Sequence, residues 1–470
     1  MSTSRPFDPA SALVQAPAPP AEVLIASAHV LDPRAGIDAP HDVLVRDGRI
    51  AEIGAPGSIA APPGAEVVDG RGRHLLPAFF DPHVHLRVPG QEHKEDIETG
   101  TRAAAAGGYC AVVAMPNTDP VVDSAPVLRS LRDAAARDAR VAVGFMPAIT
   151  RGLMGSELTE MAELRAEGAL GFTDDGKPVV SAGMLRKALQ YQRLAGGVIA
   201  LHEEDPSLSG SGAMHEGAVS AMLGISGIPS VSESTMVARD AALAGYEGGR
   251  VHMQHLSCVE SVRAVAQAKE IGVRVTAEAS PHHLCLTDEA IRGSRDGGSG
   301  PLDTNMKMNP PLRTESDRQA LIDALRSGVI DCIATDHAPH ARDEKEVPFE
   351  QAPMGTTGLE TSFAAVHTEL VLPGILPLGL VVERMTGGAA LLDLPTPKIE
   401  VGAPANLTLV DLGLEWEVGE NGYESRSANC CFAGRTLSGK VGLTVAAGAI
   451  AYRTRSLEVV KETSSVGHHS

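Results

Sequence analysis

Eight short apolar runs alternate with helical patterns along the middle of the chain, and they constrain its fold more than any other feature. Amphipathic stretches intervene, for example at 94–106 and 259–271. Strands that alternate with helices favour a parallel sheet, and eight such units are typical of a (β/α)8 TIM barrel. The runs occupy residues 75–80, 109–115, 141–146, 169–173, 198–201, 250–254, 273–278 and 331–335.

The two ends of the chain have a different texture, with short strand-like runs broken by turns. On the N-terminal side, the runs 42–46 and 49–53 flank Asp47-Gly48, which is a hairpin signal. On the C-terminal side, 405–410 and 440–445 look like strands again. Because neither end is long enough to bury a core alone, we predict one small β-sandwich module formed by both termini. The predicted divisions are a disordered tail at 1–21, the module at 22–77 and 396–455, the barrel at 78–395, and a tail at 456–470.

Composition argues against several classes of protein. A net charge of −19 disfavours binding to nucleic acid or to an anionic membrane surface. No apolar run approaches the roughly 20 residues of a membrane span. Residues 1–21 are rich in Ala, Pro and Ser but lack an apolar core segment, so we predict no secretory signal. The six cysteines are scattered without C-x-x-C spacing, which favours reduced thiols in the cytoplasm over a zinc–cysteine site.

Side chains that bind metals follow five of the apolar runs, and a barrel gathers such strand ends at one face. His83 and His85 are two residues apart, so on a strand they point the same way and can chelate one ion. Four histidines and two carboxylates exceed what one tetrahedral zinc uses, whereas two ions that share a carboxylate would use them all. The candidate ligands are His83, His85, Asp174 or Asp175, His202, His255 and Asp336.

Several nearby residues have plainer interpretations. His252 lies three residues before His255, an odd step on a strand, so we expect only one of them to face the barrel interior and select His255 at the strand end. His282 and His283 are not needed as ligands if the other residues fill both sites. The loop 340–357 mixes charged residues with glycine, which is as typical of an ordinary solvated loop as of a mobile lid.

The segment Asp81-Pro82-His83-Val84-His85-Leu86-Arg87-Val88-Pro89-Gly90 resembles the D-x-H-x-H-x-R-x-P-G segment of dihydroorotases of the bacterial type I group, within the amidohydrolase superfamily. The resemblance runs from about residue 22 to residue 450. The Gly/Ser-rich segment 292–300 looks like an insertion and predicts a flexible surface excursion. Further matching segments are 98–100, 115–118, 172–176, 212–217, 276–278, 281–284, 307–313 and 334–340.

This resemblance implies a centre of two Zn²⁺ ions per chain, although manganese or cobalt would suit the same ligands. It implies that His83, His85 and Asp336 hold the first ion, and that His202 and His255 hold the second. Asp175, the second acid of the Thr173-Asp174-Asp175-Gly176 run, would bridge them in place of the carboxylated lysine of many relatives. Spacing alone leaves Asp174 and Asp175 both open.

The resemblance also implies a substrate, the cyclic ureide L-dihydroorotate, formed reversibly from N-carbamoyl-L-aspartate in de novo pyrimidine (UMP) biosynthesis. Arg87 lies two residues beyond His85, so it points into the same barrel mouth, where a guanidinium can pair with the substrate carboxylate. Asp336 would move the proton in the reaction. The implied substrate-binding residues are Arg87, Asn117 and His340 for the carboxylate, and Asn309, Met354 and Gly355 for the ring.

Two other functions compete with this interpretation. A related cyclic amidohydrolase, such as an allantoinase or hydantoinase, shares the barrel and the metal-binding histidines but lacks the combination of Arg87, Asn117 and His340. A dihydroorotase-like chain can instead serve as a structural partner of aspartate transcarbamoylase, but the ligand set here is complete. The resemblance implies a homodimer, with a complex with that transcarbamoylase as a further expectation.

Overall fold

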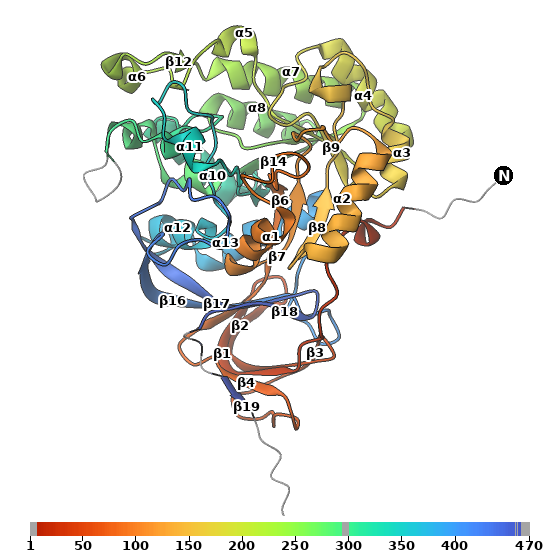
Figure 1. Ribbon diagram of the computed structural model, residues 1–470, viewed down its shortest axis with the longest axis vertical. Helices are drawn as coiled ribbons and strands as arrows, with labels where there is room; N and C mark the ends of the chain where they lie inside the picture. Colours follow the sequence, from red (N-terminus) through yellow and green to blue (C-terminus); the bar gives the residue numbers. More distant parts are fainter. Residues whose placement is uncertain (1–6, 294–299, 456, 458, 462–470) are drawn as a thin grey trace, which may run out of the picture.

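The computed structural model describes residues 7–293, 300–455, 457 and 459–461. Figure 1 shows a broad barrel lobe above a narrower lobe of β-strands, with β16–β18 lying between the barrel and β1–β4. The barrel strands are β6 (Phe79–Val84), β7 (Tyr109–Ala114), β8 (Ala142–Phe145), β9 (Gly171–Thr173), β10 (Val198–Leu201), β13 (Arg250–Met253), β14 (Arg274–Ala279) and β15 (Cys332–Ile333).

These strands are parallel and run around a closed ring. Regular pairing joins β6 to β7 and β7 to β8 in one sheet. In the other sheet it joins β9 to β10, β10 to β13, β13 to β14 and β14 to β15. A backbone hydrogen bond from Leu170 to Phe145 (3.0 Å) connects the two sheets on one side. The bond from His85 N to His337 O (2.9 Å) closes the ring on the other side. The predicted TIM-barrel class is therefore confirmed.

Helices cover the outside of the barrel and are terminated by local sequence signals. Thr314 and Asp317 form a capping box at the start of α10, and Gly328, in the left-handed conformation, ends it. The main helices are α1 (Ile97–Ala106), α2 (Ala125–Asp138), α3 (Met161–Ala166), α4 (Ala182–Ala195), α7 (Val231–Glu247), α8 (Val259–Glu270), α10 (Glu315–Ser327) and α13 (Leu378–Thr386). Shorter ones are α5 (Pro206–Ser209), α6 (Ala218–Leu223), α9 (Pro281–Cys285), α11 (Arg342–Lys345), α12 (Ser362–Val366) and α14 (Gly388–Leu391), with a small β11 (Met214–His215) and β12 (Gly227–Ile228) ladder.

Strands from both ends of the chain build the β module around a second apolar core. Asp47 (φ 50°) and Gly48 (φ 69°) form the predicted hairpin between β2 and β3, with Arg46 opposite Arg49. The strands are β1 (Val23–Asp32), β2 (Ile37–Arg46), β3 (Arg49–Gly54), β4 (Glu66–Asp69), β5 (His74–Pro77), β16 (Leu407–Glu417), β17 (Thr436–Ala446), β18 (Ala449–Arg453) and β19 (Val459–Lys461). The domain bounds 22–77, 78–395 and 396–455 stay a prediction.

The predicted first barrel strand, 75–80, is wrong in position. Leu75 and Leu76 belong to β5, which pairs with β16 in the module, whereas the barrel strand β6 begins at Phe79. One continuous apolar run thus supplies two sheets, and a sequence pattern cannot show where one ends and the next begins. The consequence for function is that His83 lies within β6 rather than beyond it.

The predictions of a disordered tail at 1–21 and of a tail at 456–470 are also partly wrong. Val14 exchanges backbone hydrogen bonds of 3.0 and 2.8 Å with Val143, and the Phe7 ring lies 3.6 Å from the guanidinium carbon of Arg165. Ala12, in the short 3₁₀ helix Pro9–Ala12, is fully buried. These few contacts order residues 7–21 although their composition resembles a tail. Likewise, β19 pairs with β4 inside the predicted C-terminal tail. Residues 1–6 and 294–299, the latter within the predicted insertion, lie outside the described residues.

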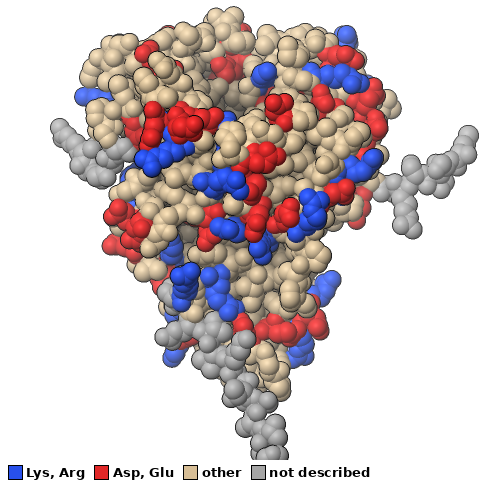
Figure 2. Space-filling model, in the orientation of Figure 1, with Lys and Arg blue, Asp and Glu red and all other residues tan. Residues whose placement is uncertain are grey.

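Charge on the molecular surface is mixed in sign. On the face drawn in Figure 2, Lys and Arg side chains are interspersed with Asp and Glu. That face of the described residues therefore does not form the basic stripe that nucleic-acid binding requires. Among the same residues, no helix is both long enough and apolar enough to cross a membrane.

Candidate active site

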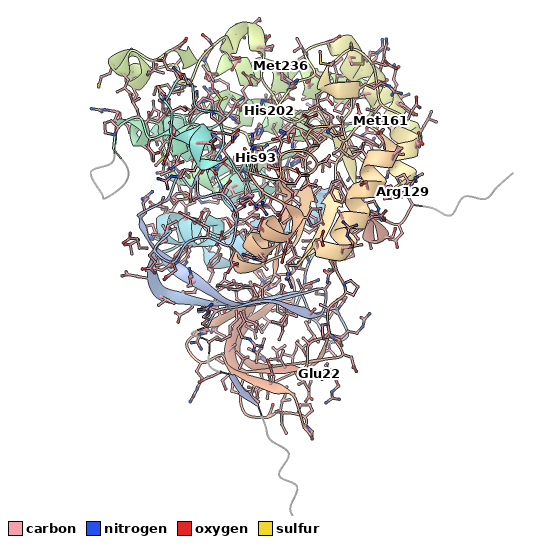
Figure 3. The ribbon with its side chains drawn as sticks, in the orientation of Figure 1. Glu22, His93, Arg129, Met161, His202 and Met236 are labelled. Carbon is pink, nitrogen blue, oxygen red and sulfur yellow. The ribbon has the colours of Figure 1, made fainter. Side chains whose placement is uncertain are left out.

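All six predicted metal ligands lie at the carboxyl ends of barrel strands. His83 is near the end of β6 and His85 follows it, while His202 comes directly after β10. Figure 3 places His202 inside the barrel lobe, far from Glu22 in the β module. Asp175, His255 and Asp336 follow β9, β13 and β15 by two or three residues. Because parallel strands end at one face of a barrel, residues far apart in sequence meet there.

Asp175 lies at the centre of this group. Its Oδ1 is 3.5 Å from His83 Nε2, and its Oδ2 is 3.4 Å from His85 Nε2. The same Oδ1 lies 3.8 Å from His202 Nδ1 and 3.7 Å from His255 Nε2. One buried carboxylate therefore faces four imidazoles, which is the position that a bridging ligand requires.

Asp336 completes the group from the last strand. Its Oδ1 lies 3.0 Å from His85 Nε2 and 3.5 Å from His83 Nε2. Asp336 (φ 47°), His255 (φ 30°) and Arg87 (φ 60°) all adopt the left-handed backbone conformation although none is glycine. Each such residue costs about 1–3 kcal/mol and persists only where the surrounding fold enforces it. The fold thus holds three residues of the site in backbone conformations that lower its stability.

The structure separates Asp174 from Asp175. Asp174 Oδ1 accepts hydrogen bonds from the backbone nitrogens of Ile149 (2.8 Å) and Thr150 (2.9 Å), and its Oδ2 accepts one from the Thr150 hydroxyl. Burial raises the pKa of Asp174 to about 6, opposed by these bonds. Asp174 is therefore an anchor for the loop after β8, and Asp175 alone faces the histidines.

The nitrogens and oxygens of the candidate ligands are arranged to bind metal ions rather than to hydrogen-bond with one another. Nε2 of His83 is buried without a hydrogen-bond partner among the described residues. Nδ1 of His202 and Nε2 of His255 face each other at 2.9 Å. Two overlapping sets of donors, each with its atoms within 4.8 Å of one another, share Asp175; they are His83, His85, Asp175 and Asp175, His202, His255. Imidazole nitrogens with carboxylate oxygens are the donor set of a two-metal hydrolytic site.

The electrostatics of the group favour cations. Burial raises the pKa of Asp175, but the His83 charge and hydrogen bonds from the histidines outweigh it and hold that pKa well below its usual value. Conversely, burial lowers the pKa of His83, but the carboxylates of Glu278 and Asp175 raise it well above its usual value. The carboxylates of the cluster therefore stay ionised. When the imidazoles are neutral, these carboxylates leave a net negative charge in the site, which favours the binding of cations.

A second ring of residues holds the outer nitrogens of the histidines, and sequence reasoning missed most of it. His83 Nδ1 lies 2.6 Å from Glu278 Oε1, and His202 Nε2 lies 3.2 Å from Glu204 Oε2. Glu278 falls in the Thr276-Ala277-Glu278 match, which was the available signal, yet no role followed from it. Such outer partners fix the tautomer and orientation of metal-binding histidines.

A cavity of about 200 Å³ opens beside these residues. It brings together all six predicted substrate-binding residues with five of the six predicted ligands, while His83 lies outside its lining. The lining residues are His85, Arg87, Asn117, Asp175, Gly176, His202, His255, Asn309, Asp336, Ala338, His340, Met354 and Gly355.

Arg87 is held firmly in the wall of this cavity. Its side chain is buried, and its Nε donates a hydrogen bond to Pro339 O at 3.0 Å. Burial lowers the pKa of Arg87 to about 10, opposed by the charges of Asp336 and Asp175, so the guanidinium stays protonated at neutral pH. His340 differs, because burial and the Arg87 charge lower its pKa to about 3. The cavity therefore presents one cationic side chain beside a neutral imidazole.

The segment after β15 is tied down in the described structure. His340 Nε2 donates to Met354 O at 2.9 Å, and Lys94 forms an ion pair with Glu344 at 2.9 Å. The buried Lys345 Nζ donates to Thr304 O (2.8 Å) and Pro353 O (2.9 Å). These contacts set the backbone position of Met354 at the cavity.

Lys345 gives a prediction on stability and pH. Burial, and then the charge of Lys307, lowers the pKa of Lys345 from 10.5 to about 7. Between these values the unfolded chain binds the proton and the folded protein does not, so the stability contributed by Lys345 rises with pH. We expect Lys345→Met to be more destabilising at pH 9.5 than at pH 6.5, by about 3 kcal/mol. Urea unfolding of both proteins at the two pH values tests this, and a pH-independent difference would contradict it.

A barrel that gathers four histidines and two carboxylates around a small polar cavity defines a metal-dependent hydrolase of the amidohydrolase kind. Comparison with known proteins specifies the family. Residues 72–261 match the family model described as Dihydro-orotase-like. The chain is 46% identical over 435 residues to dihydroorotase from Pelotomaculum thermopropionicum, which covers 92% of this chain and 99% of that protein. It is 44% identical over 431 residues to dihydroorotase from Anaeromyxobacter dehalogenans, covering 92% and 98%. The chain belongs to the dihydroorotase family.

Solved structures agree on the fold. The L-hydantoinase (dihydropyrimidinase) from Arthrobacter aurescens superposes with a TM-score of 0.80 at 25% identity, covering 93% of this chain and 97% of that one. The dihydropyrimidinase from Brevibacillus agri gives a TM-score of 0.78 at 22% identity, covering 93% and 96%. The predicted architecture, a TIM barrel with a β-sandwich module, is confirmed.

Proposed function

We propose that this protein is a dihydroorotase, which interconverts N-carbamoyl-L-aspartate and L-dihydroorotate in de novo pyrimidine (UMP) biosynthesis. Relatives that are 42–46% identical to this chain, aligned over nearly their whole length, are named dihydroorotase. The observation that carries the proposal is the buried cation Arg87 in a cavity that also contains the candidate metal ligands. A carboxylate-bearing ring amide needs both features in one site.

We assign the ligands as the family pattern implies. His83, His85 and Asp336 would hold one ion, His202 and His255 the other, and Asp175 both, with zinc as the proposed metal. The distances of Asp175 to all four histidines support this assignment. Bound there, two such ions supply an activated water near neutral pH and a polarised amide carbonyl.

Residues of the chain supply the proton transfer and the orientation of the substrate. Asp336 takes a proton from the attacking water and delivers it to the leaving ring nitrogen, and in cyclisation the same steps run backwards. Asn117 Oδ1 accepts from His85 Nδ1 at 2.8 Å, which leaves its amide nitrogen to donate to the substrate carboxylate. Asn309 donates to Glu204 Oε2 at 2.7 Å, which leaves its amide oxygen to accept from a ring N–H.

The competing function is that of a related cyclic amidohydrolase, such as a hydantoinase or dihydropyrimidinase, because the solved structures with those names share the fold. The two functions differ in their substrates: dihydroorotate has a carboxylate, whereas dihydrouracil, the substrate of a dihydropyrimidinase, has none. We expect Arg87→Met to lower kcat/KM for dihydroorotate by about 100-fold, which corresponds to about 2.7 kcal/mol of lost charge-assisted binding. Any hydrolysis of dihydrouracil should change by less than about threefold.

The matched control is Arg102→Met, which removes a partly exposed arginine of α1 that pairs with Glu424 at 3.0 Å. That variant should keep full activity on both substrates. Spectrophotometric assays of ring opening measure all the rates. A dihydroorotate rate that is insensitive to Arg87 would favour the dihydropyrimidinase function instead.

We further propose that the protein is a cytoplasmic homodimer that can assemble with aspartate transcarbamoylase. All six cysteines are buried and free, which suits a reducing compartment. Light scattering of the purified protein, alone and mixed with the transcarbamoylase, tests the assembly. A monomeric mass in both samples would contradict it.

A further inference from the structure

Glu278 touches both halves of the candidate metal centre although it lies outside the cavity lining. It lies near the end of β14 with its side chain 1% exposed. Its Oε1 accepts hydrogen bonds from His83 Nδ1 (2.6 Å) and from the backbone nitrogen of His255 (3.2 Å). One carboxylate oxygen thus contacts both His83, a proposed ligand of the first ion, and the backbone of His255, a proposed ligand of the second.

The other oxygen of Glu278 is held from behind by His252. Glu278 Oε2 lies 2.9 Å from His252 Nε2, and His252 Nδ1 lies 2.9 Å from Thr276 Oγ1. The two histidines contact the site differently. The His255 ring faces Asp175 at 3.7 Å and reaches Glu278 only through its backbone nitrogen, whereas His252 contacts Glu278 through its ring. That only one of them faces the barrel interior stays a prediction.

These contacts also bear on a competing interpretation. His252, Glu278 and Cys332 have ligand atoms within 4.8 Å of one another, which is the spacing of a third metal site. However, both oxygens of Glu278 and both ring nitrogens of His252 already have hydrogen-bond partners at 2.6–3.2 Å. A buried carboxylate with three donors is a completed hydrogen-bond network and offers little to an additional ion.

We propose that Glu278 is a positioning residue that couples the two ion-binding groups. By accepting from His83 Nδ1–H it fixes the tautomer that presents Nε2 to the first ion, and by accepting from His255 N it fixes the backbone that presents His255 to the second. This inference rests on the proposed function only in assuming that the centre binds metal. Outer partners of this kind change metal affinity by about 10–100-fold when they are replaced.

The test compares zinc affinity of the full-length wild type with that of Glu278→Gln. Glutamine keeps the shape and an acceptor oxygen but loses the charge that strengthens the His83 bond. After metal removal, zinc is titrated in competition with a chromophoric chelator, and the visible spectrum of the Co²⁺ form is recorded. We expect zinc affinity to fall by about 10–100-fold for both ions and the Co²⁺ spectrum to change.

Two further variants keep the test decisive. Asp42→Asn removes the charge of another buried carboxylate, which accepts from Ser27 N (2.8 Å) in the β module, and should leave zinc affinity unchanged. His252→Leu removes the hydrogen bond to Glu278 Oε2 and should also lower zinc affinity. This variant provides the test if Glu278→Gln does not fold. Circular dichroism of each metal-free protein establishes which variants are folded.

The outcomes separate the hypotheses. Unchanged zinc affinity and an unchanged Co²⁺ spectrum in a folded Glu278→Gln variant would overturn the inference. Three bound ions in the wild type, reduced to two in Cys332→Ala, would replace it with a third metal site. If the wild type binds two ions but does not hydrolyse dihydroorotate, the proposed function fails while the zinc titrations still decide the role of Glu278.

Discussion

Asp336→Asn is expected to lower kcat for dihydroorotate hydrolysis by about 10³-fold, because the amide cannot take the proton of the attacking water. The side chain is positioned for that role by its 3.0 Å contact to His85 Nε2 and by the left-handed backbone at residue 336. Rates are measured at saturating zinc, so that a weaker ligand is not mistaken for a lost base. Bound metal is counted on the same sample.

A matched variant at the other end of β15 controls for this prediction. Asp331 pairs with Lys269 at 2.7 Å and accepts from Ala277 N, on the face of the barrel opposite the cavity. Asp331→Asn should therefore keep normal turnover while Asp336→Asn loses it. Near-normal turnover in folded, metal-loaded Asp336→Asn would remove Asp336 from the proton transfer.

The second large effect is expected at Asp175, with its neighbour Asp174 as the internal control. Asp175→Asn should lower the bound ions from about two per chain to at most about one, because the shared carboxylate charge is lost. Turnover should fall to the background of the metal-free protein. Metal analysis after gel filtration, together with the dihydroorotate assay, measures both quantities.

Asp174→Asn should give the opposite combination. It removes the acceptor of the Thr150 hydroxyl and should cost about 1–3 kcal/mol of stability. Metal content and kcat should stay close to those of the wild type, because Asp174 does not face the histidines. If Asp174→Asn lost the metal and Asp175→Asn kept it, the assignment of the bridging residue would be reversed.

The fold was predictable where local pattern and global architecture agree. The Asp47-Gly48 hairpin needed only two residues that tolerate positive φ. The ligand positions followed from strand ends and from the two-residue spacing of His83 and His85. The pattern failed at 75–80, where one apolar run serves two sheets, and at 7–21, where a few long-range contacts order a segment whose composition resembles a tail.

The fine geometry of the site was beyond sequence reasoning for a different reason. Asp174 and Asp175 are neighbours of the same type, and only the approach of Thr150 from another strand end distinguishes them. The left-handed backbones of His255 and Asp336 are imposed by tertiary structure against their own preference. Glu278 has its role through His83, which lies far away in the sequence. Pairings of this kind are fixed by the closure of the barrel.

The most direct test of the account is an assay of L-dihydroorotate hydrolysis on the purified protein, with metal content determined on the same sample. We predict turnover with about two zinc ions per chain, lost on chelation and restored by added zinc. Two bound ions without dihydroorotate turnover would contradict the proposed function and favour a related cyclic amidohydrolase. Neither metal nor activity after zinc is added would favour a structural partner of aspartate transcarbamoylase.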